Sequence, residues 1–155
     1  MSLRGGTRRL AFAVLPVLAA AGLGGLGSRR AASTYARLDK PRWAPPGSVF
    51  GPVWTALYAT LAVAGWRTYD ASPRARGLHL AQLALNAAWP ALFFGIREKR
   101  ASLMLISALD ATVALEAATL RHDDRLAAAL LAPYLAWCGY ATALNAAVSD
   151  PTTTA

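Results

Sequence analysis

Aromatic and amide side chains recur at helical spacing in three long uncharged stretches of this 155-residue chain. Residues three or four positions apart lie on one side of a helix. Flat rings with a few polar groups beside them are typical of a site for a hydrophobic small molecule. The alternative is that the rings only pack the helices together. The three stripes are Phe50, Trp54, Tyr58 and Leu61; Asn86, Trp89 and Phe93; and Tyr134, Trp137, Ala141, Leu144 and Asn145.

Two carboxylates interrupt a further apolar stretch. Asp110 lies near its middle, and an ionisable residue inside a membrane segment is a functional candidate. A channel or ion transporter that uses Asp110 is therefore one hypothesis. Glu116 follows six positions later, about 120° around a helix, so the two do not form a paired acid site. We expect Glu116 to extend toward Arg121 at the helix end.

Metal chemistry and disulfide chemistry find little support. His79 and His122 are placed at segment ends, and neither has a second ligand four positions on, so no metal site is predicted. The single cysteine, Cys138, cannot form an intrachain disulfide and is expected to be a packing residue. The sequence contains no phosphate loop, nucleophile elbow or HExxH motif, so whether the protein is an enzyme stays open.

Five mostly apolar segments separate the charged clusters, and each is long enough to cross a bilayer as a helix. Helix is favoured over a barrel because the segments do not alternate in polarity. The sequence therefore predicts an all-α fold, an integral membrane bundle of five transmembrane helices in a single domain over residues 1–155. The expected helices span residues 8–28, 47–68, 77–97, 101–121 and 125–149.

The formal net charge of +8 comes from arginine clusters at the ends of these segments. Such clusters are typical flanks of membrane helices, so we expect membrane lipid and no nucleic acid as a partner. Lys and Arg are equally divided between the two sides, which leaves the orientation open. The first segment could instead be a cleaved signal peptide. A multi-pass protein of the cell membrane is the expected location.

The connection between the first two segments is long and rich in proline, with Pro41, Pro45 and Pro46. Long loops in a compact domain are often functional, and proline stiffens them. We expect residues 29–46 to form a lid over one mouth of the bundle.

These stripes and this loop also carry a family resemblance. Lys40-Pro41-Arg42-Trp43-Ala44-Pro45-Pro46 and Val49-Phe50-Gly51-Pro52-Val53-Trp54-Thr55 resemble the signature of the translocator protein family, TspO/MBR. Gln82-Leu83-Ala84-Leu85-Asn86 with Trp89-Pro90 is similar to its third helix. Pro133-Tyr134-Leu135-Ala136-Trp137 is similar to its fifth.

The resemblance implies a five-helix bundle that binds porphyrins or similar hydrophobic ligands and acts in transport, sensing or tetrapyrrole homeostasis. The stripes contain no axial haem ligand, so no cofactor is expected and a porphyrin would be a ligand held by stacking and shape. An alternative is light- and oxygen-dependent porphyrin degradation, with Trp54 and Trp137 as the catalytic candidates. The implied ligand-binding residues are Trp43, Phe50, Trp54, Tyr58, Asn86, Trp89, Phe93, Trp137, Ala141 and Leu144.

Several positions depart from the family pattern. Ser48 replaces a loop tryptophan, and Ala101 and Leu105 replace an aromatic and an acidic residue. No sterol motif follows the last segment, so cholesterol transport is not expected. The family is often homodimeric, and small residues such as Ala84 and Ala88 make the third helix a candidate interface.

Overall fold

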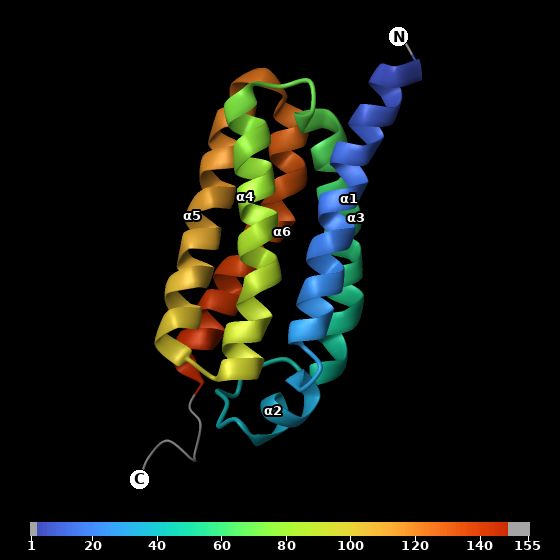
Figure 1. Ribbon diagram of the computed structural model, residues 1–155. Helices are drawn as coiled ribbons and strands as arrows, with labels where there is room; N and C mark the ends of the chain where they lie inside the picture. The colour runs from blue at the N-terminus through green and yellow to red at the C-terminus, as the bar shows by residue number, and fades with distance from the viewer. Residues whose placement is uncertain (1–2, 149–155) are drawn as a thin grey trace.

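The computed structural model describes residues 3–148, and the regular elements of that range are all helical. Five long helices lie side by side, with one short helix below them (Figure 1). The all-α class predicted from the sequence is thus confirmed. In chain order the elements are α1 (Leu3–Gly27), α2 (Ala31–Arg37), the 3₁₀ turn η1 (Gly47–Val49), α3 (Phe50–Thr68), α4 (Pro73–Pro90), the π-helical turn η2 (Ala91–Ile96), α5 (Lys99–Asp123) and α6 (Arg125–Ala147).

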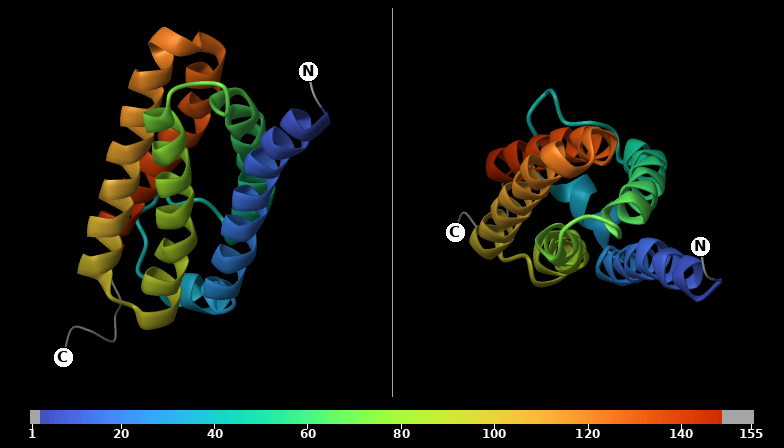
Figure 2. Two further views of the ribbon diagram at one scale, coloured as in Figure 1. Left: turned by 45° about the horizontal axis from the view of Figure 1, so that its top comes forward. Right: turned by 90° about the horizontal axis from the view of Figure 1, so that it is seen from above.

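The long helices form a closed ring, which Figure 2 shows from one end. Around the ring the order is α1, α3, α6, α5 and α4, and α4 packs against α1 to close it. Helices α3 and α4 follow each other in the chain but are not ring neighbours. Side-chain contacts between these two helices therefore cross the interior of the ring.

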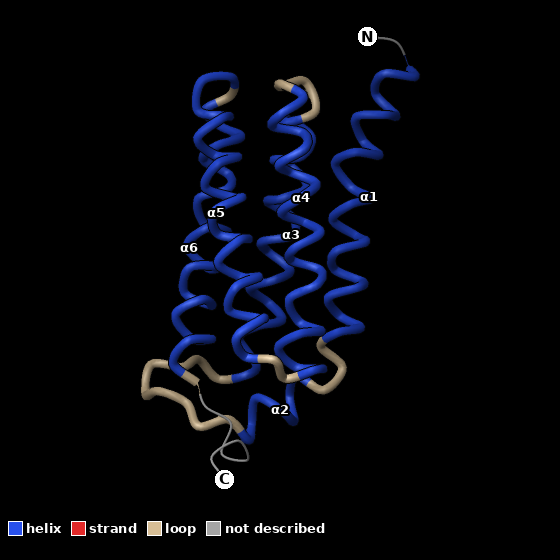
Figure 3. The backbone as a smooth tube through the Cα atoms, turned by 60° about the vertical axis from the view of Figure 1, so that its left-hand side comes forward, coloured by secondary structure: helices blue, strands red, loops and turns tan. Residues whose placement is uncertain are grey.

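The two ends of the ring differ. At one end, which we call the loop end, α2 and the segment 28–49 lie across the helices (Figure 3). At the other, which we call the turn end, short connections at residues 69–72 and at Asp124 join the helices. The aromatic stripes of α3 and α6 begin near the loop end, so this segment is well placed to cover them.

Helix starts at the turn end are fixed by capping residues. The Ser72 hydroxyl accepts a hydrogen bond from the Ala75 N–H at 3.2 Å, and Pro73 occupies the first helical position of α4. The Asp124 carboxylate accepts from the N–H groups of Leu126 and Ala127. Both caps satisfy N–H groups that a helix start leaves without partners.

Four helical segments are long and apolar enough to cross a membrane. They are Gly5–Gly27, Gly47–Thr68, Lys99–Asp123 and Arg125–Ala147. Of the five predicted transmembrane helices, four are therefore long and apolar enough to cross a membrane. The remaining helix, α4, carries arginines in its first turn and buries His79, Gln82 and Asn86 toward the bundle, which lowers its hydropathy.

Large apolar side chains also cover the outside of the ring. Leu15, Leu18, Met104 and Leu126 each expose more than half of their surface. A water-facing surface rarely gathers so many exposed apolar residues, whereas lipid is an apolar solvent for them. The exterior of the ring is thus suited to contact lipid.

The expected lid loop over residues 29–46 contains a helix, α2, at Ala31–Arg37. This stretch contains good helix formers and ends before Pro41, which cannot continue a helix. The Lys40 ammonium donates to the carbonyls of Tyr35 at 2.7 Å and Leu38 at 2.8 Å. A cation at a helix C-terminus satisfies carbonyls that the helix leaves free. The connection is therefore an ordered cover that includes a helix.

Candidate functional site

Aromatic side chains from α2, α3, α6 and the connecting segment gather at the loop end. We call this group the aromatic cluster. Successive ring centroids lie 5.2–5.9 Å apart from Tyr35 to Phe50, Trp137, Tyr140 and Trp43. Most of these pairs meet edge to face, the arrangement that ring quadrupoles favour. The cluster consists of Tyr35, Trp43, Phe50, Trp54, Tyr58, Tyr134, Trp137 and Tyr140.

The deeper part of the cluster lies between α3 and α6. The Trp54 ring is 5.4 Å from the Tyr58 ring and 6.2 Å from the Tyr134 ring. Tyr134 is fully buried, and Trp54, Tyr58 and Trp137 pack against the buried core. The two tryptophans singled out from the sequence thus belong to one continuous group of rings.

A polar contact crosses the interior of the ring of helices at the end of the aromatic cluster that is furthest from the loop end. The Tyr58 hydroxyl donates to Asn86 Oδ1 at 2.9 Å, which joins α3 to α4. Asn86 is buried, and a Cβ atom on Gly24 of α1 would lie 3.6 Å from the same hydroxyl. Asn86 therefore presents an amide to the interior beside the aromatic cluster.

The segment 28–49 is tied down over this cluster by hydrogen bonds from two tyrosines. Tyr35 donates to the Pro45 carbonyl at 2.7 Å, and Tyr140 of α6 donates to the Trp43 carbonyl at 3.0 Å. Burial raises the pKa of Tyr35 above its ordinary value, so its hydroxyl remains a donor. Trp43 stays 49% exposed and forms the outer edge of the cover.

The other predicted ligand-binding residues lie in different surroundings. Trp89 and Phe93 stack on each other at 4.9 Å on α4 and η2, with Phe94 beside them. Ala141 is partly buried against the core, and Leu144 is buried. No ring contact between Trp89 or Phe93 and the aromatic cluster occurs within the described residues 3–148.

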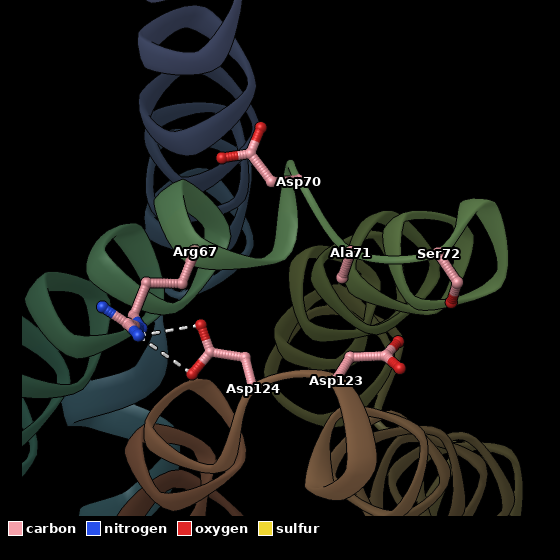
Figure 4. Close-up of a pocket in the computed structure, with 6 residues that line it drawn as sticks. All are labelled: Arg67, Asp70, Ala71, Ser72, Asp123 and Asp124. Atoms are coloured by element: carbon pink, nitrogen blue, oxygen red, sulfur yellow. Dashed lines mark hydrogen bonds and ion pairs between the residues drawn. The ribbon is translucent and has the colours of Figure 1, made fainter.

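Two surface pockets lie at the ends of the ring. One, of about 540 Å³, is at the turn end, where Arg67 faces Asp124 across the helix connections (Figure 4). The other, of about 330 Å³, lies at the loop end between the α1–α2 junction and η2. Their linings are Arg67, Asp70, Ala71, Ser72, Asp123 and Asp124 for the first, and Leu26, Gly27, Arg29, Arg30, Ala91, Gly95 and Ile96 for the second.

Asp110 has a hydrogen-bond partner on the neighbouring helix. The Thr142 hydroxyl of α6 donates to Asp110 Oδ2 at 2.6 Å, while Asp110 Oδ1 is buried with no partner among the described residues. The side chain is only half-buried. This contact links α5 to α6 inside the membrane-spanning region.

The expected position of Glu116 is wrong. Its side chain is fully buried, and its Oε1 lies 2.8 Å from His79 Nδ1 on α4. The prediction that it would extend toward Arg121 failed because α4 places a histidine opposite it. His79 is fully buried as well, two turns inside α4. The only sequence signal was that each is an ionisable residue in a mostly apolar stretch.

The described residues contain no group of three or more His, Cys, Asp or Glu side chains that could hold a metal ion. The family model of the TspO/MBR family matches residues 12–149. This chain belongs to the TspO/MBR family. Together with the four long apolar helices, membership makes it a multi-pass integral membrane protein.

Relatives of this TspO/MBR chain come from distant organisms. The tryptophan-rich protein TspO of Archaeoglobus fulgidus is 35% identical over 145 residues, which are 90% of this chain and 94% of the relative. The human translocator protein is 37% identical over 118 residues, 72% of this chain and 70% of the relative. The tryptophan-rich sensory protein of Cereibacter sphaeroides is 35% identical over 113 residues, 72% of each.

Proposed function

We propose that this protein binds a tetrapyrrole, or a similarly flat hydrophobic ligand, between α3 and α6 beneath the segment 28–49. The observation that carries the proposal is the meeting of Trp54 and Trp137 in one group of rings. The names of the relatives, translocator and sensory protein, support a role in transport, sensing or tetrapyrrole homeostasis.

The chemistry of the aromatic cluster suits such a ligand. A macrocycle offers two flat faces, and indole and phenol rings bind such faces by stacking and edge contacts. Dispersion and geometry decide binding in lipid, since moving an apolar ligand out of lipid gains little from the hydrophobic effect. Asn86 supplies one amide beside the rings, which can orient polar groups of the ligand. No metal ligation by the protein is required.

Entry of a ligand requires the rings to separate, because they fill the space between α3 and α6 by touching one another. The segment 28–49 is held to α6 by the hydrogen bond from Tyr140 to the Trp43 carbonyl. One hydrogen bond contributes only about 1 kcal/mol, so this tie can open at low cost. We therefore expect the segment to act as a lid that moves when the ligand enters.

The site can be tested with Trp137→Ala and protoporphyrin, monitored by quenching of tryptophan fluorescence. We expect affinity to fall about tenfold, because Trp137 is partly buried against the core and truncating an aromatic anchor typically costs about 1–2 kcal/mol. Trp66→Ala is the matched control, since Trp66 lies at the turn end beneath Arg9. Equal affinity in the wild type and Trp137→Ala would refute this site.

The alternative activity is degradation of a porphyrin in light and oxygen. Each candidate tryptophan has a phenol neighbour, Tyr58 for Trp54 and Tyr140 for Trp137, at 5.4 and 5.6 Å between ring centroids. Such neighbours could donate an electron to an oxidised indole. Illumination of the protein with protoporphyrin should then give a new absorbing product that disappears in Trp54→Phe and Trp137→Phe. Binding of protoporphyrin without any new product on illumination would refute the degradation activity and leave the binding function alone.

We further propose that α4 together with η2 is the fifth membrane crossing, in the cell membrane. Residues 73–96 as helix would span about 36 Å, enough for a bilayer core. Helices α1 and α5 flank α4, so its polar side chains face protein instead of lipid. Accessibility of single cysteines introduced at residues 71 and 97, in a Cys138→Ala background, should then differ between the two sides of the membrane.

A homodimer through α4 is a separate proposal. Ala84, Ala88, Ala91 and Gly95 form an exposed ridge of small residues along α4 and η2. Small residues allow close approach of helices in lipid. Ala88→Leu should reduce chemical cross-linking between copies, whereas Ala114→Leu on the exposed side of α5 should not.

A further inference from the structure

The half of the ring near the turn end contains a buried acid–base pair that the proposed ligand site does not use. His79 Nδ1 and Glu116 Oε1 are 2.8 Å apart, and both side chains have no exposed surface. A charge buried in low dielectric is costly unless an opposite charge accompanies it. The pair therefore favours a state of zero net charge, which holds one proton shared between imidazole and carboxylate.

Polar atoms with unmet hydrogen-bonding capacity surround this pair. His79 Nε2 and Glu116 Oε2 are buried without a partner among the described residues. The same is true of the Thr68 hydroxyl and of both polar atoms of the Gln82 amide. Buried polar groups normally have partners, and ordered water often provides them. The free polar atoms of the pair, of Thr68 and of Gln82 are thus suited to bind water.

The imidazole of His79 lies directly against α3. A Cβ atom on Gly65 would come within 2.7 Å of His79 Nε2, so only glycine leaves room for the ring there. Thr68 is one turn further along α3 on the same side, toward the turn end. The Thr68 hydroxyl therefore lies between the pair and the end of the bundle.

A water-accessible pocket lies above the pair. The turn-end pocket of about 540 Å³ is lined by Ser72 and Asp123, among others (Figure 4). Ser72 comes two turns before His79, at the start of α4, and therefore lies on the same face of that helix as His79. In the same way, Asp123 comes two turns after Glu116 on α5 and shares a helix face with Glu116. The depth from pocket lining to pair is about 10 Å along the helices. Ala75 and Leu120, both fully buried, form the intervening layer.

The charged groups nearest the pair along its helices have other positions or partners: Arg76, one turn before His79 on α4, donates to the Tyr69 carbonyl at 3.0 Å. Helix α1 faces His79 with Phe12, whose ring lies 5.8 Å away, and α3 faces it with Gly65. The only charged residue of α6 is Arg125, at its first position. On α5 itself, Asp110 is bonded to Thr142. Of the charges that line the pocket, Asp124 pairs with Arg67 and Asp70 pairs with Arg9, while Asp123 has no ion pair among the described residues.

We propose that His79 and Glu116 form a proton-binding site that exchanges with water of the turn-end pocket past Thr68 and Leu120. In the loading step a hydronium ion in the pocket loses a proton, and an N–H or O–H bond forms on the pair. In the release step that bond breaks and a water molecule accepts the proton. No electron is transferred, and the charge of the pair changes by one. The ligand of this site is a proton with its hydrating water.

Nitrogen NMR of histidine rings tests the pair directly, because the chain has only two histidines. His122 is exposed and provides an internal control. The His79 ring signals should change in Glu116→Gln because its Nδ1 lies 2.8 Å from Glu116 Oε1, whereas the His122 signals should not. Identical His79 signals in the wild type and Glu116→Gln would overturn the pairing.

Exchange of the His79 ring N–H with solvent tests the route. Thr68→Val should slow exchange by about threefold to tenfold, the factor that one hydrogen bond is worth. Thr34→Val is the matched control, since Thr34 is a buried threonine with an unpartnered hydroxyl at the loop end. Leu120→Ala should speed exchange, whereas Leu109→Ala, equally buried on α5, should not. Equal effects of the variants and their controls would refute the route.

Discussion

The loop-end half and the turn-end half of this bundle fill their interiors with different kinds of side chain. Near the loop end the space between α3 and α6 is filled by rings, with one amide–phenol contact between Asn86 and Tyr58. Near the turn end the ring of helices instead encloses His79 and Glu116. Rings that meet edge to face can part for a ligand with a modest loss of dispersion. A buried acid–base pair cannot part without exposing a charge to low dielectric.

This difference predicts that the two halves have different roles in ligand binding and in stability. The loop-end half should respond to ligands and tolerate substitutions that keep its apolar surface. The turn-end half should be less tolerant, because several of its polar atoms depend on one another. Stability and ligand affinity should therefore respond to different sets of variants.

The largest effect is expected from Glu116→Ala. Removing one partner of a buried hydrogen-bonded pair leaves the other without a partner, which typically costs about 1–3 kcal/mol of unfolding free energy and more for a charged group. Protoporphyrin affinity of the protein that remains folded should not change, because Glu116 belongs to the turn-end half. Unfolding in detergent, followed by helical circular dichroism, measures the loss.

A double variant sharpens this prediction. Replacing His79 and Glu116 together by leucine should recover much of the stability, since apolar pairs often replace buried ion pairs without loss. If Glu116→Ala proves as stable as the wild type, the pair does not stabilise the turn-end half. The comparison between the halves would then fail on its energetic side.

Two glycines allow the halves to be compared by the same substitution. A Cβ on Gly65 would lie 2.7 Å from His79 Nε2 and 3.3 Å from the Ala13 backbone, so Gly65→Ala should cost about 1–3 kcal/mol through overpacking. A Cβ on Gly24 would meet Tyr58 at 3.6 Å and Pro90 at 3.8 Å, which are ordinary contacts. Gly24→Ala should be neutral or slightly stabilising, because alanine favours helix by about 0.5–1 kcal/mol. Thermal unfolding of both variants gives the comparison.

Sequence reasoning captured the loop-end half better than the turn-end half, for a physical reason. The stripe of Phe50, Trp54 and Tyr58 is a local pattern, because residues one turn apart share a helix side whatever the tertiary structure. The contact between His79 and Glu116 joins residues 37 positions apart and depends on α4 lying beside α5. Nothing in the spacing of single polar residues determines that neighbour relation.

Two further features needed coordinates for the same reason. The helix α2 lies within a proline-rich connection, and only the fold shows its C-terminus held by Lys40. The hydropathy of α4 is lowered by residues that are useful only once helices surround it. For α4, local composition contradicts the structure because contacts with distant helices compensate for it.

A smaller effect is expected for the polar contact of the loop-end half. Tyr58→Phe removes the hydrogen bond to Asn86 while keeping the ring, and should cost about 0.5–1.5 kcal/mol. If Asn86 forms a hydrogen bond to bound protoporphyrin, the loss of unfolding free energy caused by Tyr58→Phe should be smaller in the presence of the ligand. Denaturation with and without ligand measures this difference. A cost that is identical in both conditions would show that Asn86 does not contact the ligand.

The smallest effect concerns the charged rim of the turn end. The Asp124 carboxylate accepts hydrogen bonds from the N–H groups of Leu126 and Ala127 and pairs with Arg67 Nη2 at 2.9 Å. The backbone hydrogen bond from Ala127 is the main cause that lowers the pKa of Asp124. A carboxyl whose pKa is lower in the folded protein stabilises the fold above its unfolded pKa of about 4. That contribution is lost as the pH falls through the folded pKa.

Asp124→Asn keeps an oxygen for the helix cap but removes the ion pair, so it should cost about 0.2–1 kcal/mol at neutral pH. Asp124→Ala removes both and should cost about 0.5–2 kcal/mol. Because an exposed ion pair is screened by salt, high ionic strength should shrink the first cost and leave most of the second. Melting temperatures of both variants, at neutral pH and below pH 4, distinguish the contribution of the helix cap from that of the ion pair. The melting temperature of the Asn variant should approach that of the wild type at the lower pH. If it does not, Asp124 acts at the turn end through its shape alone, and the charges around the pocket contribute nothing to holding that end closed.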